Sequence, residues 1–195
     1  MTIQDVNFIK ESLSVLVGQP MRNLGRAGAM IVANFGELVE TNIAARNENG
    51  EFVRDENGIR IQIRGLDGRH AINVLCKARF TCGDEVIFGS SDIFLPSTKI
   101  ISRTNFNWQT FNWSIEGNNS FDEKLARHFM GEFSEYVVKD VKVSKFGDLT
   151  ILFKNDFGLE LFSNYSRDGE NWCLYDVDTN NALSVLGNGI EERLG

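Results

Sequence analysis

Residues 163–171 bring Asp168, Glu170 and Asn171 together between two apolar runs at 159–162 and 172–175. A carboxylate beside an aromatic ring can hold a polar ligand, and Glu170 is two residues from a tryptophan. Asp168 and the following glycine are also a standard turn pair, and neighbouring Ser and Asn side chains suit a turn through hydrogen bonds to the backbone. The stretch is therefore either a binding loop or only the turn between two strands.

The three thiols are the next candidates for chemistry. A catalytic cysteine needs a partly exposed thiol whose pKa is lowered by its surroundings. Alternation of side chains along residues 70–82 predicts that Cys76 and Cys82 share an apolar strand face, and Cys173 lies between a tryptophan and a leucine. Buried free cysteines behave as small hydrophobic residues, so we expect unpaired, unreactive thiols.

Metal and cofactor sites have little support. His70 and His128 are the only histidines, and no CxxC or HxxxH spacing accompanies them. Residues 176–181 begin like a calcium loop, but the sixth position is Asn181 and the twelfth is Gly187, where glycine and glutamate are required. The pattern predicts a turn there, and we expect neither metal nor cofactor.

Other catalytic motifs are also missing. Ser90, Ser91 and Asp92 follow a strand without a G-x-S-x-G elbow, and no glycine-rich phosphate loop of the Walker or Rossmann type occurs. Acids are plentiful, but the separation of a carboxylate pair cannot be read from sequence. The residue types therefore indicate no particular reaction.

Composition narrows the classes of protein. The chain has 195 residues, 42% of them hydrophobic, which suffices for one well-formed core. The net charge of −7 disfavours nucleic acid and suits a partner protein with a basic surface. No apolar stretch approaches the length of a membrane span, and the cysteine usage fits reduced thiols, so we expect a cytoplasmic protein. Oligomeric state is left open.

The first half predicts one helix and several strands. Apolar spacing indicates a helix over 5–17 capped by Asp5, followed by a strand at 28–35. Asn49-Gly50 and Asn57-Gly58 predict hairpin turns. Residues 59–64 and 70–82 alternate as strands, with Ile59, Ile61 and Ile63 on one face, and the longer strand should bend.

The second half repeats the scheme. Ser120-x-x-Glu123 predicts a capping box opening a helix, and its apolar stripe contains Phe121, Leu125, His128 and Phe129. Four strands follow at 137–144, 148–154, 158–164 and 171–175, joined as an antiparallel meander. We therefore predict a single α+β domain in which one helix precedes each half, 1–96 and 120–195. Residues 147–151 echo residues 28–32, a short match that reflects either a weak internal duplication or chance.

The segment at 97–119 joins the halves. Its Phe and Trp side chains carry too much apolar area for a mobile linker. We expect residues 111–123 in particular to form an ordered bridge between the halves, with Trp113 and Phe121 packed as anchors at its ends. Such a scaffold would hold polar side chains rigidly for recognition. The candidate binding surface comprises Asp92, Trp113, Glu116, Asn118, Asn119, Asp122 and Glu170.

Three stretches resemble a family of uncharacterised bacterial proteins. These stretches are 88–96, 113–125 and 146–175, which contain Gly-Ser-x-Asp, Gly-Asn-x-x-Phe-Asp and Leu-Glu-x-Phe…Glu-x-Trp segments in that order. The resemblance spans residues 16–175 and implies no catalytic residue. Residues 76–79 depart from the expected Cys-x-Trp-Arg, and residues 40–65 are expanded relative to the family pattern.

The leading functional expectation is a non-catalytic protein-binding module of the immunity or adaptor type. Charge complementarity and aromatic anchors are the features on which such interfaces depend. The alternative is a small-molecule-binding protein or an enzyme that uses an acidic cleft between the halves, near Asp92, Glu116 and Asp122.

Overall fold

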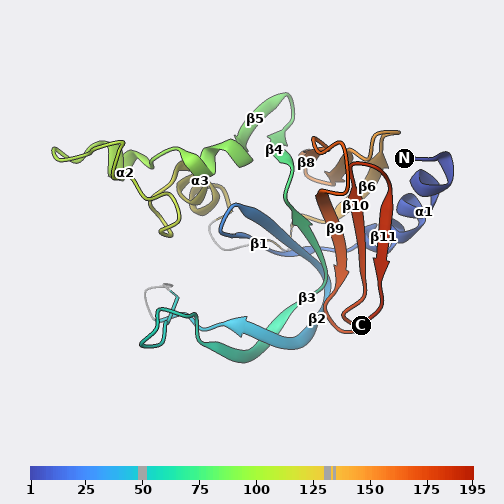
Figure 1. Cartoon of the computed structure of the whole chain (residues 1–195), viewed down its shortest axis with the longest axis horizontal. Helices are drawn as coiled ribbons and strands as arrows, with labels where there is room; N and C mark the ends of the chain where they lie inside the picture. Colours follow the sequence, from blue (N-terminus) through green and yellow to red (C-terminus); the bar gives the residue numbers. More distant parts are fainter. Residues whose placement is uncertain (48–51, 130–132, 134) are drawn as a thin grey trace.

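The computed structural model describes residues 1–47, 52–129, 133 and 135–195, and its strands form two antiparallel sheets (Figure 1). The six-stranded sheet has the order β1 (Met21–Ala27), β2 (Met30–Ala44), β3 (Gln62–Val74), β9 (Glu170–Asp176), β10 (Ala182–Leu186) and β11 (Ile190–Arg193). The five-stranded sheet has the order β5 (Glu85–Gly89), β4 (Lys77–Cys82), β8 (Phe157–Phe162), β7 (Leu149–Phe153) and β6 (Val138–Val143). The helices are α1 (Ile3–Leu13), α2 (Thr98–Ile101) and α3 (Ser120–Phe129), with 3₁₀ turns η1 (Ser14–Leu16) and η2 (Ser90–Phe94). This architecture agrees with the predicted α+β class built on antiparallel sheets.

The N-terminal helix starts earlier than its spacing predicted. Thr2, not Asp5, is the N-cap: its hydroxyl accepts from the backbone N–H of Asp5, and the Asp5 carboxylate accepts from the backbone N–H of Thr2. This reciprocal pair is a capping box, which satisfies two otherwise unpaired amide groups. Ile9, Leu13 and Leu16 are fully buried, so the apolar stripe anchors α1 and η1 to the core.

The strand expected at 28–35 is one arm of a hairpin. β1 was not anticipated, because its polar and apolar residues alternate poorly; it pairs with β2 through a tight turn in which Gly28 has φ 64°. The predicted turn at Asn57-Gly58 is confirmed, since Gly58 has φ 77° and the Asp55 amide donates to the Ile59 carbonyl. The predicted turn at 49–50 lies outside the described residues.

The long alternating stretch at 70–82 bends, as predicted. The bend moves the chain from β3 in one sheet to β4 in the other, and the amides of Leu75 and Cys76 both donate to the Asn171 carbonyl at 2.9 Å. Cys76 is buried on the expected face, but Cys82 is exposed because it ends the strand beside the turn at Gly83. All three cysteines are free thiols.

The C-terminal strands exist but do not form one meander. β6, β7 and β8 pair in sequence, whereas β9 leaves for the other sheet and lies between β3 and β10. The polar stretch before β9 is therefore a crossover between sheets and not a hairpin turn. The buried Asn171 side chain stabilises this crossover, because its Oδ1 accepts from the amides of Asn164 and Tyr165 at 2.9 and 3.0 Å.

Both halves contribute strands to both sheets. Strands β1 to β5 correspond in order to strands β6 to β10. Exchanging each strand for its counterpart converts the order β1-β2-β3-β9-β10 into β6-β7-β8-β4-β5, which is the order of the other sheet. This equivalence is what an internal duplication would produce, and the duplication stays a prediction. Pairing of β3 with β9 and of β4 with β8 joins the halves into one core.

Large rings fill that core. Trp172 is completely buried and donates from Nε1 to the Gly147 carbonyl at 2.8 Å. Phe80 and Phe88 stack with ring centroids 4.4 Å apart, and Phe121 of α3 meets Phe88 edge to face. Among the described residues, none of the helices has the length and apolar character that crossing a membrane requires.

Candidate functional site

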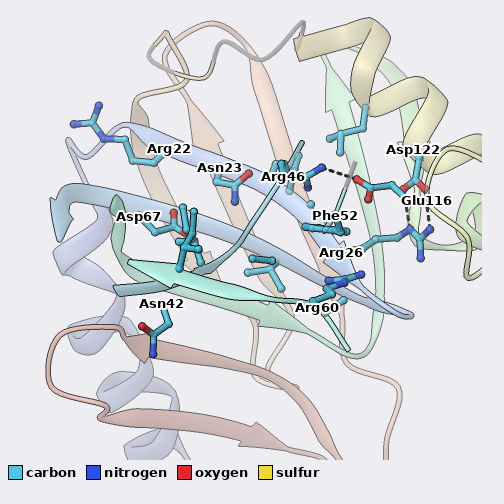
Figure 2. A pocket seen from close by; sticks show the side chains of 18 of the residues that line it. Arg22, Asn23, Arg26, Asn42, Arg46, Phe52, Arg60, Asp67, Glu116 and Asp122 are labelled. Carbon is cyan, nitrogen blue, oxygen red and sulfur yellow. Dashed lines mark hydrogen bonds and ion pairs between the residues drawn. The ribbon is translucent and has the colours of Figure 1, made fainter. Parts of the chain in front are cut away.

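A cavity of about 690 Å³ lies between the β2–β3 arm and the segment preceding and opening α3, with β1 also contributing to its wall (Figure 2). We call this cavity the arginine cleft. Its lining is not acidic as expected, because arginines outnumber carboxylates, and Asp92 is not part of it. The charged lining residues are Arg22, Arg26, Arg46, Arg54, Arg60, Asp67, Glu116 and Asp122.

Local strand pairing brings several of these arginines to one surface. The pairs Arg46 with Phe52 and Arg54 with Arg60 face each other across short antiparallel bridges. The Val53 amide donates to the Ala45 carbonyl at 2.9 Å, and the Ile61 amide donates to the Val53 carbonyl at 3.0 Å. These backbone hydrogen bonds hold together the chain around residues 45, 53 and 61. Because side chains alternate across a strand, both pairs project from the same face, which lines the cleft.

The centre of this face is a stack of charged and aromatic groups. The guanidinium carbons of Arg46 and Arg60 lie 3.9 and 3.8 Å from the centroid of the Phe52 ring. Two guanidinium groups this close to one centroid must occupy opposite faces of the ring, as Figure 2 shows. Cation–π attraction therefore fixes the plane of each group. Arg46 also contacts the Glu116 carboxylate at 2.9 Å.

Arg26 crosses the cleft to α3. Its Nε and Nη2 donate to the two carboxylate oxygens of Asp122 at 2.7 and 2.8 Å, and Nη1 donates to the Gly28 carbonyl at 3.0 Å. The Trp113 and Ile115 carbonyls accept longer bonds from Nη2. The side chains of this ion pair are only 7% and 12% exposed. Arg26 is thus committed to holding β1 against residues 113–122.

Asp122 and Asn119 organise the same segment from within. Asn119 is fully buried; its Oδ1 accepts from the Asp122 amide at 2.8 Å, and its Nδ2 donates to the Trp113 carbonyl at 3.0 Å. Asp122 Oδ2 also accepts from the Gly117 amide at 2.9 Å. These bonds connect residues 113, 117, 119 and 122 to one another.

The cap of α3 differs from the predicted capping box by one residue. Asn119, not Ser120, accepts from the third helical amide, that of Asp122. The Glu123 carboxylate does not cap α3; it accepts from the amide of Thr98 in α2 at 2.9 Å and from the Thr98 hydroxyl. Asparagine and serine are both favourable caps. The buried contact between Asn119 and the Trp113 carbonyl selects the asparagine.

Two other predicted site residues, Asp92 and Asn118, make hydrogen bonds and ion pairs within the protein beside the cleft. Asp92 accepts from the Gly89 amide at 2.9 Å and pairs with Lys124 of α3 at 3.1 Å. Asn118 donates from Nδ2 to the Asn112 carbonyl at 3.3 Å. Both stabilise the region beside the cleft without lining it.

Glu170 lies apart from the other predicted site residues. It belongs to β9, accepts from the Ser184 hydroxyl at 2.5 Å and is 4.0 Å from Arg193. Glu170 therefore lies on the six-stranded sheet, away from the segment 113–122. That segment holds five of the predicted site residues: Trp113, Glu116, Asn118, Asn119 and Asp122.

The aromatic residues of the bridge differ in burial. Trp113 is partly buried and packs edge to face against Phe94 with centroids 5.0 Å apart. Trp108 is 58% exposed, although we expected the aromatic residues to avoid water. Its ring contacts are local: the centroids of the Phe106 and Phe111 rings lie 5.1 and 6.2 Å from that of Trp108.

Burial shifts two titrations in the cleft. Burial, followed by the like charge of Arg54, lowers the pKa of Arg60. At the other end of the cleft, burial raises the pKa of Asp67, and hydrogen bonds from Gly68 and Asn23 offset part of this shift. A lowered arginine pKa and a raised aspartate pKa both mean that burial in the cleft disfavours the charged form of these side chains.

Sequence analysis missed the cleft arginines because they come from four separate segments. One signal was present: a hairpin turn at Asn57-Gly58 places Arg54 opposite Arg60. Among the described residues, no group of three or more His, Cys, Asp or Glu is arranged to hold a metal ion.

Comparison with family models, curated proteins and solved structures found no match to this chain, so its resemblance to uncharacterised bacterial proteins stays a prediction.

Proposed function

We propose that this chain is a non-catalytic, cytoplasmic binding protein of the adaptor or immunity type, and that it recognises an acidic segment of a partner protein in the arginine cleft. The observation that supports this proposal is the reversed local charge. Among the described residues that line the cleft, five are arginines and three are carboxylates, on a chain whose net charge is −7.

Local charge, not net charge, decides which groups dock at a contact. The net charge led us to expect a partner with a basic surface, whereas the cleft favours a partner with carboxylate or other anionic groups. Asp122 and Glu116 neutralise Arg26 and Arg46, so a surplus of positive charge remains for a ligand.

The apolar lining adds a second requirement. Leu38, Ile63 and Leu66 line the cleft and are each about half exposed, at 49%, 46% and 56%. Exposed aliphatic side chains beside arginines suit a partner segment that mixes acidic and apolar residues.

A pair of charged polymers tests the proposal. Fluorescently labelled poly-L-glutamate should bind the chain at low ionic strength, although both carry net negative charge. Ser114→Glu adds a negative charge to the cleft lining and should weaken this binding at least about threefold, because like charges repel across an interface. Ser166→Glu adds the same charge at an exposed position outside the cleft lining and is the matched control. Binding of poly-L-lysine alone, or equal effects of the two variants, would refute the proposal.

A small-molecule-binding role is the second candidate. The cavity volume of about 690 Å³ lies within the range of small-ligand pockets, about 300–1,000 Å³. Saturable binding of small anions without binding of poly-L-glutamate would favour this role over the partner-protein role.

A further inference from the structure

At one end of the arginine cleft, the described arginines outnumber the described carboxylates that contact them. Arg26 pairs with Asp122 and Arg46 pairs with Glu116. Among the residues that the structure describes, no carboxylate makes an ion pair with Arg54 or Arg60, although the charge of Glu116, which pairs with Arg46, also acts on Arg60. Arg54 donates to the Gly58 carbonyl at 2.7 Å, and Arg60 stacks on Phe52.

These two arginines are neighbours on the same face. They are cross-strand partners: burial and then the like charge of Arg54 lower the pKa of Arg60, against the opposing effect of Glu116. Arg60 is partly buried, so water screens its charge less than on an open surface. Its ring contact with Phe52 holds the guanidinium plane, which reduces the entropy lost when a ligand is bound.

We infer that Arg54 and Arg60 form a binding site for a phosphate monoester at this end of the cleft. The inference rests on the cleft as the binding site in the proposed function, but not on a protein partner. Two neighbouring guanidinium groups that make no ion pair with a described carboxylate match a group that carries about −1.5 to −2 charges at neutral pH. Guanidinium forks also fit the tetrahedral oxygens of phosphate through paired hydrogen bonds.

The phosphate monoester can come from a phosphorylated side chain or from a small phosphorylated molecule. The chemistry at Arg54 and Arg60 is the same for both. The two sources differ in whether flanking peptide groups add affinity against the apolar walls of the cleft, such as Ile63 and Leu66.

The test uses phenyl phosphate as the probe, titrated into the full chain by calorimetry at constant ionic strength. Arg60→Gln should weaken binding at least about tenfold, because a charge-assisted, bidentate contact is lost. Arg64→Gln is the matched control, since Arg64 is exposed on β3 outside the cleft lining and should change affinity less than twofold. Arg54→Gln, at an exposed position, is a second variant if Arg60→Gln fails to fold.

Two further measurements separate a phosphate site from general attraction. Dimethyl phosphate, with one charge, should bind at least about tenfold more weakly, and phenyl phosphate affinity should fall as the pH drops below the second phosphate pKa of about 6. Equal affinities for the two probes, or equal losses in the Arg60 and Arg64 variants, would overturn the inference.

A third arm identifies the source. A blocked phosphoserine peptide that binds more tightly than phenyl phosphate indicates a phosphorylated protein, and equal affinity indicates a small molecule; either result supports the site. Poly-L-glutamate binding without phosphate binding would overturn this inference alone. Phosphate binding without poly-L-glutamate binding would instead remove the acidic partner of the proposed function.

Discussion

Replacement of Asp122 by Asn tests how the cleft is held together. The substitution keeps the size of the side chain and an oxygen acceptor but removes the charge that Arg26 contacts through two bonds of 2.7 and 2.8 Å. The Arg26 guanidinium would then remain in a buried position with only carbonyl groups and an amide as partners. The cost therefore falls on an uncompensated buried charge.

The magnitude follows from burial. With the two side chains 7% and 12% exposed, removing one partner should cost about 3–5 kcal/mol of unfolding free energy. Because the oxygen of the introduced carboxamide would still accept from the Gly117 amide, we expect the lower end, about 3 kcal/mol. For a chain of this size that corresponds to a fall in Tm of about 6–12 °C.

Urea unfolding followed by tryptophan fluorescence measures this cost. Glu116→Gln is the control, because it breaks the exposed Arg46 pair, whose side chains are 48% and 44% exposed, and should cost less than about 1 kcal/mol. If Asp122→Asn and Glu116→Gln destabilise the chain equally, the Arg26 pair is not a buried anchor and the reasoning fails.

Three other outcomes are expected. Trp172→Ala should cost about 3–5 kcal/mol in urea unfolding because the ring is fully buried, and an unchanged midpoint would contradict this. Burial lowers the pKa of His70 despite the nearby Asp176 carboxylate, so the unfolded chain binds more protons below about pH 6.5 and stability should fall as pH decreases through that range; His70→Gln should flatten the profile measured by unfolding at several pH values. Cys82 should react rapidly with a thiol reagent in the native chain, whereas Cys76, buried and with its pKa raised to about 11, should react only after unfolding; rapid labelling of both, mapped by mass spectrometry, would show that β4 is not packed as described.

The spacing of apolar residues along the chain predicted much of the secondary structure. The alternation through residues 70–82 predicted the burial of Ile72, Val74, Cys76, Ala78 and Phe80 but not the exposure of Cys82, and the spacing of apolar residues predicted α1 and α3 to within a few residues. These predictions succeed because a helix or strand presents its faces with a fixed period whatever the surrounding fold. The predicted positions of the two helix N-caps were wrong by three residues and one residue, because several neighbouring side chains can each cap a helix.

The partnership of the strands was decided by the tertiary structure. Nothing in residues 163–169 distinguishes a hairpin turn from a crossover, and the choice depends on Asn171, whose buried groups bind backbone from both sides. The arginine cleft was hidden for the same reason. Arg26 and Asp122 are 96 residues apart in the chain, and only packing of β1 against α3 makes them partners.

The sequence by itself therefore determined the α+β class with antiparallel sheets and most of the buried face along residues 70–80. Only the tertiary structure decided which charges meet, because the energy of a charge depends on its burial and its neighbours in space. Net charge is a sum over the chain and predicted an acidic protein. The sign of the cleft is local, and it arises because folding brings five arginines together with three carboxylates among the described lining residues.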